Sequence, residues 1–204
     1  MTEQEWLNCA DPRPMLRFLN GKVSNRKLRL FAVACCWSIW HLLTDARSQR
    51  AVETAERYAD GKATEAELNS AWNAMREAVA ASAMAAARDA VTASATAAAW
   101  CVNTAVSWAA WHADETINQA IFVRDIFNPW LTPMIPLAWL TWHDGLPVSM
   151  AWRMYDTRDF ADMPVLADGL EEAGCQDQDI LGHCRSGGEH VRGCWLLDLL
   201  MGKS

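Results

Sequence analysis

The sequence lacks the short motifs that identify the common enzyme classes. It contains no glycine-rich phosphate-binding loop, no serine elbow and no pair of CxxC motifs. It also shows no sustained alternation of apolar and polar residues, the pattern that is typical of a half-buried β-strand. The chain is therefore predicted to be all-α with little or no β-sheet, and no motif assigns it to an enzyme class.

A long apolar run and a secretory signal are missing as well. The longest apolar stretch, residues 28–43, falls short of the roughly 20 apolar residues that a bilayer requires, and it contains Arg29. Residues 2–5 are acidic, unlike the start of a signal peptide, and the seven cysteines are an odd number without regular spacing. These features predict a cytoplasmic protein with reduced thiols and no membrane span.

Residues 28–43 (LRLFAVACCWSIWHLL) are apolar on nearly every side. A helix with this pattern is normally enclosed by the rest of the chain. We expect it to be the buried centre of a compact multi-helix bundle. The twelve tryptophans are expected to act as large anchors between the surrounding helices.

Glycine and proline are absent from residues 64–128, and alanine supplies 19 of the 43 residues from 71 to 113. Alanine favours helices and lets them approach closely. A single helix over residues 64–128 would be about 95 Å long, too long for a domain of this size. The pattern therefore predicts a long, Ala-rich antiparallel helix pair, with residues 89–94 favoured over residues 103–104 as the point where it folds back.

Capping residues and helix breakers predict the remaining elements. A short helix is expected to begin at Thr2. Ser24 or Asn25 can cap the central helix, and Asp45 or Thr44 the next one, because their side chains can accept hydrogen bonds from the first turn. Thr64 and Glu67 are predicted to form a capping box. Residues 11–14 (DPRP) are predicted to be a rigid connector. Residues 177–184 should form a short helix, and residues 190–201 a final apolar helix closed by glycine.

The domain organisation is predicted from the prolines. They punctuate residues 129–147, a stretch that also holds three tryptophans. We expect this stretch to connect an N-terminal helical body, residues 1–128, to a C-terminal helical piece, residues 148–204. The two parts are expected to pack together as a single globular unit.

Charge argues against nucleic acid as the partner. The formal net charge is −7, although residues 11–50 carry eight basic and two acidic residues. This segment is either a basic face for an acidic partner or a segment that is solvated or packed beside the acidic remainder. A nucleic-acid contact would involve the basic residues of its first half: Arg13, Arg17, Lys22, Arg26, Lys27 and Arg29.

One polar cluster near the C-terminus has metal-ligating residue types. On the predicted final helix, His190 and Cys194 are four residues apart and share a face, and His183 or Cys184 could approach across the glycine loop. These residues could supply three or four ligands for zinc, the one cofactor considered, although their spacing matches no common zinc module. The alternative is that the cysteines are small packing residues.

The same cluster supports an enzyme hypothesis. Cys184 or Cys194 could act as a nucleophile with His183 or His190 as its base. Asp198 interrupts an apolar run and needs a polar partner, for which a structural ion pair or hydrogen bond is expected. No catalytic residue is assigned, and these five residues are candidates only.

The favoured functional hypothesis is a non-enzymatic module that binds a protein, a peptide or a second copy of the chain. It depends on Trp130, Trp139 and Trp142, because tryptophan is favoured at interaction hot spots. Burial of these side chains would remove the main support for the hypothesis. The alternative is a metal- or thiol-dependent enzyme that uses His183, His190 and Cys194.

Both ends of the chain resemble a paralogous family of uncharacterised proteins from planctomycete bacteria. The similar residues are EWLNCADPRPMLRFLNGKVSNRKLRLFAVACC at the start and LADGLEEAGCQDQDILGHCRSGGEHVRGCWLLDLLMGK at the end. The middle is similar only in character. Where Trp37 and Ser38 stand, the family usually has two arginines. The resemblance implies a bacterial, cytoplasmic, all-helical protein and implies no activity.

Overall fold

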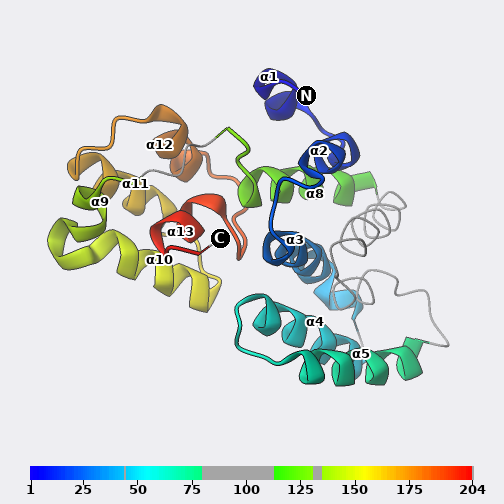
Figure 1. The fold of residues 1–204 in the computed structure, drawn as a ribbon. Coiled ribbons are helices and arrows are strands. Elements are labelled where there is room, and N and C mark those ends of the chain that lie inside the picture. Colours follow the sequence, from blue (N-terminus) through cyan, green and yellow to red (C-terminus); the bar gives the residue numbers. More distant parts are fainter. Residues whose placement is uncertain (44, 80–112, 131–134, 204) are drawn as a thin grey trace. The chain divides into compact units, whose positions relative to one another are not determined.

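Helices make up all the regular secondary structure in residues 1–43, 45–79, 113–130 and 135–203, the part that the computed structural model describes (Figure 1). The predicted all-α fold is thereby confirmed. In these ranges no helix is both long enough and apolar enough to cross a membrane. The chain divides into two units, Met1–Arg124 and Asp125–Ser204.

The first unit begins with two short helices whose caps are formed by side chains. Thr2 and Glu5 form a capping box at the start of α1 (Glu3–Asn8). Asp11 accepts a hydrogen bond from the backbone of Arg13 at the start of α2 (Pro12–Leu19). The predicted connector over residues 11–14 is therefore wrong. Proline is tolerated in the first turn of a helix, where its missing N–H would have no partner.

The predicted central helix is buried, but it is shorter than expected. It corresponds to α3 (Asn25–Ser38), which Ser24 caps, followed by the 3₁₀ turn η1 (Trp40–Leu42). Every residue from Leu30 to Cys36 is at most 5% exposed. The α-helix ends at Ser38, whose hydroxyl donates to the carbonyl of Cys35 at 2.9 Å. Such side-chain bonds compete with regular backbone hydrogen bonding.

Two basic residues of α3, Arg26 and Arg29, make contacts within the first unit. Buried Arg29 places its guanidinium 4.6 Å from the centre of the Tyr58 ring. Arg26 pairs with Asp60 at 3.1 Å. Contact with an aromatic ring and with an opposite charge thus accommodates these two basic residues of the buried helix.

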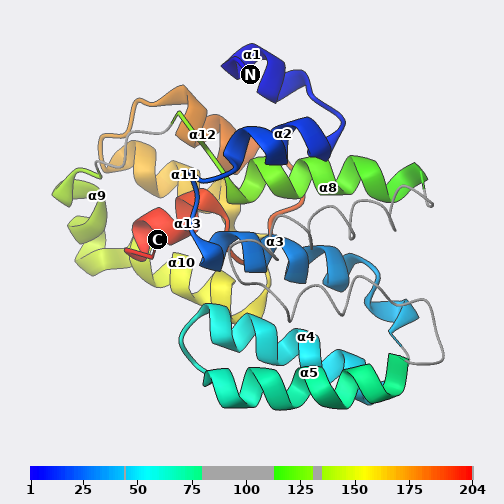
Figure 2. The ribbon, with the colours of Figure 1, turned by 45° about the vertical axis from the view of Figure 1, so that its right-hand side comes forward.

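One helix packs beside α3, and the next packs beside that helix. They are α4 (Ala46–Ala59), capped by Asp45, and α5 (Glu65–Val79), which begins at the predicted capping box of Thr64 and Glu67 (Figure 2). After the undescribed residues, α8 (Ala113–Ile126) ends shortly before Pro129. The predicted fold-back near residues 89–94 lies outside the described residues.

The second unit has a core made by residues from five helices. These residues include Trp139, Met154, Leu166, Leu181 and Leu196. Residues 129–147, predicted as a connector, lie within this unit and contain the first two of its elements. The elements are α9 (Leu137–Thr141), η2 (Trp142–Gly145), α10 (Leu146–Thr157), α11 (Met163–Glu172), α12 (Gln178–Arg185) and α13 (Trp195–Leu200).

The last helix corrects a prediction on which the candidate site depended. Instead of one helix over residues 190–201, α13 begins only at Trp195, and residues 186–194 have no regular secondary structure. We call residues 186–194 the irregular segment. Gly187 and Gly193 in this segment have φ of 65° and 95°, and a right-handed helix cannot continue through either backbone conformation.

Candidate metal centre

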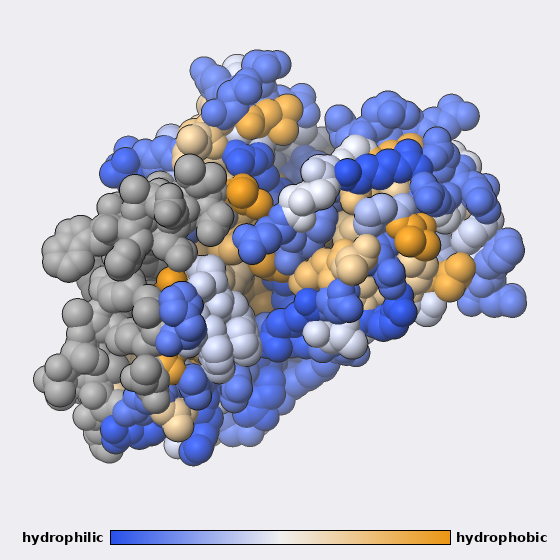
Figure 3. Space-filling model, turned by 180° about the vertical axis from the view of Figure 1, so that it is seen from behind, coloured by the Kyte–Doolittle hydropathy of each residue, from blue (hydrophilic) through white to orange (hydrophobic). Residues whose placement is uncertain are grey.

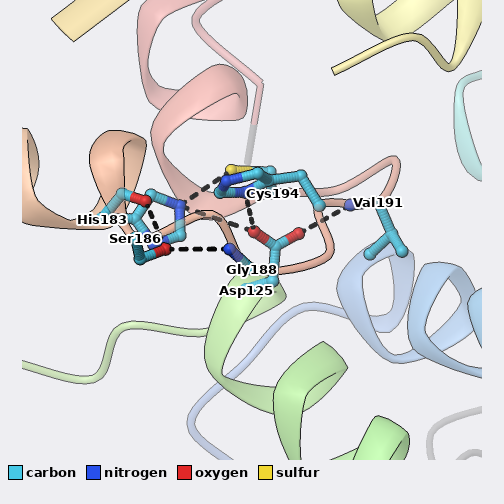
Figure 4. A network of polar contacts seen from close by, with 7 residues as sticks. Asp125, His183, Ser186, Gly188, Val191 and Cys194 are labelled. Atoms are coloured by element: carbon cyan, nitrogen blue, oxygen red, sulfur yellow. Dashed lines mark hydrogen bonds and ion pairs between the residues drawn. The ribbon is translucent and has the colours of Figure 1, made fainter. Parts of the chain in front are cut away.

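Four side chains with metal-ligating atoms converge in the second unit. Asp125 is the first residue of this unit, His183 belongs to α12, and His190 and Cys194 belong to the irregular segment. One donor atom of each residue lies within 4.8 Å of the donor atoms of the other three. Figure 4 shows the carboxylate of Asp125, the imidazole of His183 and the sulfur of Cys194 pointing toward one another.

Local hydrogen bonds position His183. Asp177 caps α12 by accepting hydrogen bonds from the backbone N–H groups of Asp179 and Ile180, at 2.9 and 3.3 Å. At the other end of the helix, the hydroxyl of Ser186 donates to the carbonyl of His183 at 2.9 Å. Both ends of this short helix are therefore tied by side chains, which fixes the turn that carries the imidazole.

Asp125 holds the irregular segment through both of its carboxylate oxygens. Oδ1 lies 2.6 Å from Nδ1 of His190, and Oδ2 accepts a hydrogen bond from the backbone N–H of Val191 at 2.8 Å. Arg192 adds two hydrogen bonds, from Nε to the carbonyl of Tyr155 and from an η nitrogen to that of Asp156, at 2.6 and 2.7 Å. His190 and Val191 of the irregular segment are therefore bonded to Asp125, and the next residue, Arg192, is bonded to the end of α10.

The distances around His183 are close to those between ligands of one metal ion. Its Nε2 lies 3.2 Å from Sγ of Cys194 and 3.5 Å from Oδ1 of Asp125. Ligands of a tetrahedral zinc ion are separated by about 3.3 to 3.6 Å, as metal–ligand bonds of about 2.0 to 2.3 Å require. The 2.6 Å between Asp125 and His190 is instead a hydrogen-bond distance.

His190 has one nitrogen with a partner and one without. Its side chain is 6% exposed, and Nε2 is buried with no hydrogen-bond partner among the described residues, whereas Nδ1 is held by Asp125. A buried polar atom without a partner costs about 1 to 3 kcal/mol. Zinc-bound histidines commonly ligate through one ring nitrogen and donate the other N–H to a carboxylate. The contacts of His190 match this pattern, with Nε2 left for an ion.

The electrostatics of His183 leave its imidazole neutral at pH 7. Burial, with a smaller contribution from neighbouring His190, lowers the pKa of His183 to about 4, although Asp125 opposes the shift. A metal ion binds the neutral imidazole, because protonation would occupy the lone pair. His183 is therefore in the form that a metal requires.

His183 does not have the contacts of the histidine in a Cys-His-Asp catalytic relay. In such a relay the histidine uses one ring nitrogen for the nucleophile and the other for the carboxylate. His183 presents the same atom, Nε2, to both Cys194 and Asp125. Cys194 is also fully buried at 0% exposure. His190, by contrast, presents Nδ1 to Asp125, as the histidine of such a relay would.

Of the sequence candidates, the structure brings together His183, His190 and Cys194. Cys184 is not in the group; like Cys194 it lies in the hydrophobic core of the second unit, and burial raises the pKa of its thiol to about 12. Asp198 is buried on α13 at 1% exposure and is not in the group. The prediction that His190 and Cys194 share a helix face is wrong, because neither residue is in a helix.

Asp125 was missed by the sequence analysis. It is 3% exposed near the end of α8, and apart from Arg124 its neighbours in the sequence are apolar: Val123, Ile126 and Phe127. A carboxylate in an apolar run is the signal that singled out Asp198. The same signal was present at Asp125, but nothing local pairs it with His190, 65 positions later.

The three tryptophans predicted to bind a partner differ in exposure. Trp139 is 8% exposed within the core of the second unit, and Trp130 and Trp142 are half-buried. The ring of Trp142 lies against Gly169, and a Cβ added to this glycine would be 3.2 Å from that ring. On the face drawn in Figure 3, hydrophobic residues form separate patches among hydrophilic ones. These observations do not strengthen the interaction hypothesis.

Comparisons with known proteins identified no relative of the chain. No protein-family model, no curated protein and no solved structure matches the chain. Membership of the planctomycete family stays a prediction.

Proposed function

We propose that the second unit binds a divalent transition-metal ion, through Nε2 of His183, Nε2 of His190 and Sγ of Cys194. The observation that carries this proposal is the buried, partnerless Nε2 of His190 within a group of converging donor atoms. Asp125 has the position of the carboxylate that orients a ligating histidine. In a tetrahedral zinc site these three donors would lie about 3.3 to 3.6 Å from one another.

Zinc is the ion that these donors suit best. Two imidazole nitrogens and one thiolate form a borderline-soft set, whereas calcium and magnesium take oxygen ligands. Zinc tolerates such mixed sets because it has no geometric preference from d-electrons. The expected cofactor is therefore Zn²⁺, with Co²⁺ as a spectroscopic substitute.

A metal-dependent enzyme is the second candidate. Three protein ligands and one further position are the arrangement of catalytic zinc sites. The side chains of Asp125, His183 and His190 are 3%, 16% and 6% exposed, which gives a substrate little access. This burial favours an ion with a structural role. The interaction module and the cytoplasmic location remain predictions.

The test is the zinc content of the purified chain. We expect one zinc per chain by mass spectrometry of the metal, and zinc titration of the stripped protein should reproduce this stoichiometry. His190→Ala and Cys194→Ser should each lose the bound ion, because each removes one ligand from a site with three.

Cys184→Ser is the matched control for Cys194→Ser. Both residues are buried cysteines of the second unit, but only Cys194 belongs to the converging group. Retention of zinc in Cys184→Ser and its loss in Cys194→Ser would support the proposal. No zinc in the wild-type chain, or equal zinc content in both variants, would refute it.

A further inference from the structure

We infer that the bound ion holds the irregular segment, residues 186–194, closed against the rest of the second unit. This inference rests on the proposed metal site. It assigns the ion a regulatory consequence, since loading or removing the ion would change the order of one defined stretch of chain.

The irregular segment has little local structure to hold it. It contains no helical turn of its own, and three of its nine residues are glycines. Gly187 and Gly193 have left-handed backbone conformations. Residues 186–189 are exposed, so burial of apolar side chains does not order this part of the segment. Glycine-rich backbone loses the most conformational entropy when it becomes ordered.

The contacts that fasten the segment are concentrated at the metal group. His190 and Val191 contact the carboxylate of Asp125, and Cys194 contacts His183. Arg192 makes the further hydrogen bonds to the end of α10. Two of the three proposed ligands therefore lie in the segment and one lies on α12, outside it.

An ion bound to these ligands would cross-link the segment to α12. The cross-link joins residues on both sides of the glycines at 187 and 188, which closes the loop between His183 and His190. Closure of a flexible loop removes open conformations from the ensemble. Without the ion, the segment is held by these hydrogen bonds and by the burial of Cys194 in the core of the second unit.

Hydrogen–deuterium exchange of the whole chain, resolved by peptide, tests this inference. The zinc-loaded protein is compared with the same protein after chelation and with the chelated protein after zinc is restored. Zinc is expected to slow amide exchange in residues 186–194 by about tenfold or more, because exchange there requires local opening. Peptides from α11 (Met163–Glu172), whose helix carries no ligand, are expected to slow less than residues 186–194.

The variant His190→Ala separates closure from general stabilisation. It should show fast exchange in residues 186–194 whether or not zinc is present, while α11 stays protected. Wild-type protein that binds one zinc but shows unchanged exchange in the segment would overturn this inference and leave the proposed metal site intact. Slowing spread equally over the second unit would also overturn it. Failure to bind zinc would refute the proposed function itself.

Discussion

Asp125 is the residue on which the candidate centre converges. Its two carboxylate oxygens contact His190 and the backbone of Val191, and Oδ1 also lies 3.5 Å from Nε2 of His183. A carboxylate with these contacts could be a fourth ligand or the partner that orients His190. The hydrogen-bond distance to Nδ1 of His190 favours the second role.

Asp125→Asn tests this role at the residue scale. Asparagine keeps the shape of the side chain but lacks the charge that fixes the imidazole. We expect the affinity for zinc to fall by about 10 to 100-fold, the usual effect of losing an outer carboxylate. Titration of the stripped protein against a competing chelator measures it. Complete loss of zinc would instead make Asp125 a ligand.

At the scale of the element, α12 is a short helix that depends on its cap. The oxygen of Asp177 satisfies two backbone N–H groups at its start, and His183 lies in its last turn. An eight-residue helix is marginal by itself, because nucleation is costly. Packing of Ile180, Leu181 and Cys184 into the core supplies the rest of its stability.

Asp177→Ala should therefore destabilise the protein. Loss of an N-cap costs about 0.5 to 2 kcal/mol, and we expect a decrease of this size in the free energy of unfolding, measured with denaturant. Asp177→Asn is the matched control, since asparagine caps about as well as aspartate. An equal decrease in both variants would show that the charge matters and the cap does not.

At the scale of the whole molecule, the acidic charge is unevenly divided. Residues 1–124 carry 13 basic and 13 acidic residues, whereas residues 125–204 carry 5 basic and 12 acidic residues. The formal net charge of −7 therefore belongs to the sequence of the second unit. A negative potential raises the local concentration of cations and speeds their binding, with a dependence on salt.

Zinc is expected to stabilise the folded chain by linkage. At a free zinc concentration 100 times the dissociation constant, a ligand that binds only the folded state adds about 2.7 kcal/mol. Thermal or denaturant unfolding with and without zinc measures the gain. Zinc should add little to the free energy of unfolding of His190→Ala. An increase equal to that of the wild-type chain would mean that zinc stabilises the protein through other sites.

Sequence patterns predicted the parts of the fold that depend on neighbouring residues. The caps at Thr2, Ser24, Asp45 and Asp177 are present, and the burial of residues 30–36 follows from an apolar pattern on every side. Caps and periodicity act within about one or two helical turns. One sequence, without a tertiary structure, is therefore enough to locate helix caps and fully buried helices.

The boundaries of two elements required the structure. The central helix ends at Ser38, where a side chain bonds to the backbone of the preceding turn. The last helix begins at Trp195, after the left-handed backbone of Gly193. Serine and glycine also occur inside helices, so their presence alone does not say which conformation they adopt.

The sequence alone determined an all-α chain with ligand-type residues near its C-terminus. Only the tertiary structure decided that His183, His190 and Cys194 converge without sharing a helix, and that Asp125 joins them. The physical reason is that helix formation depends on local hydrogen bonds, whereas a four-residue group depends on how distant parts of the chain pack. Packing of this kind leaves no fixed spacing in the sequence.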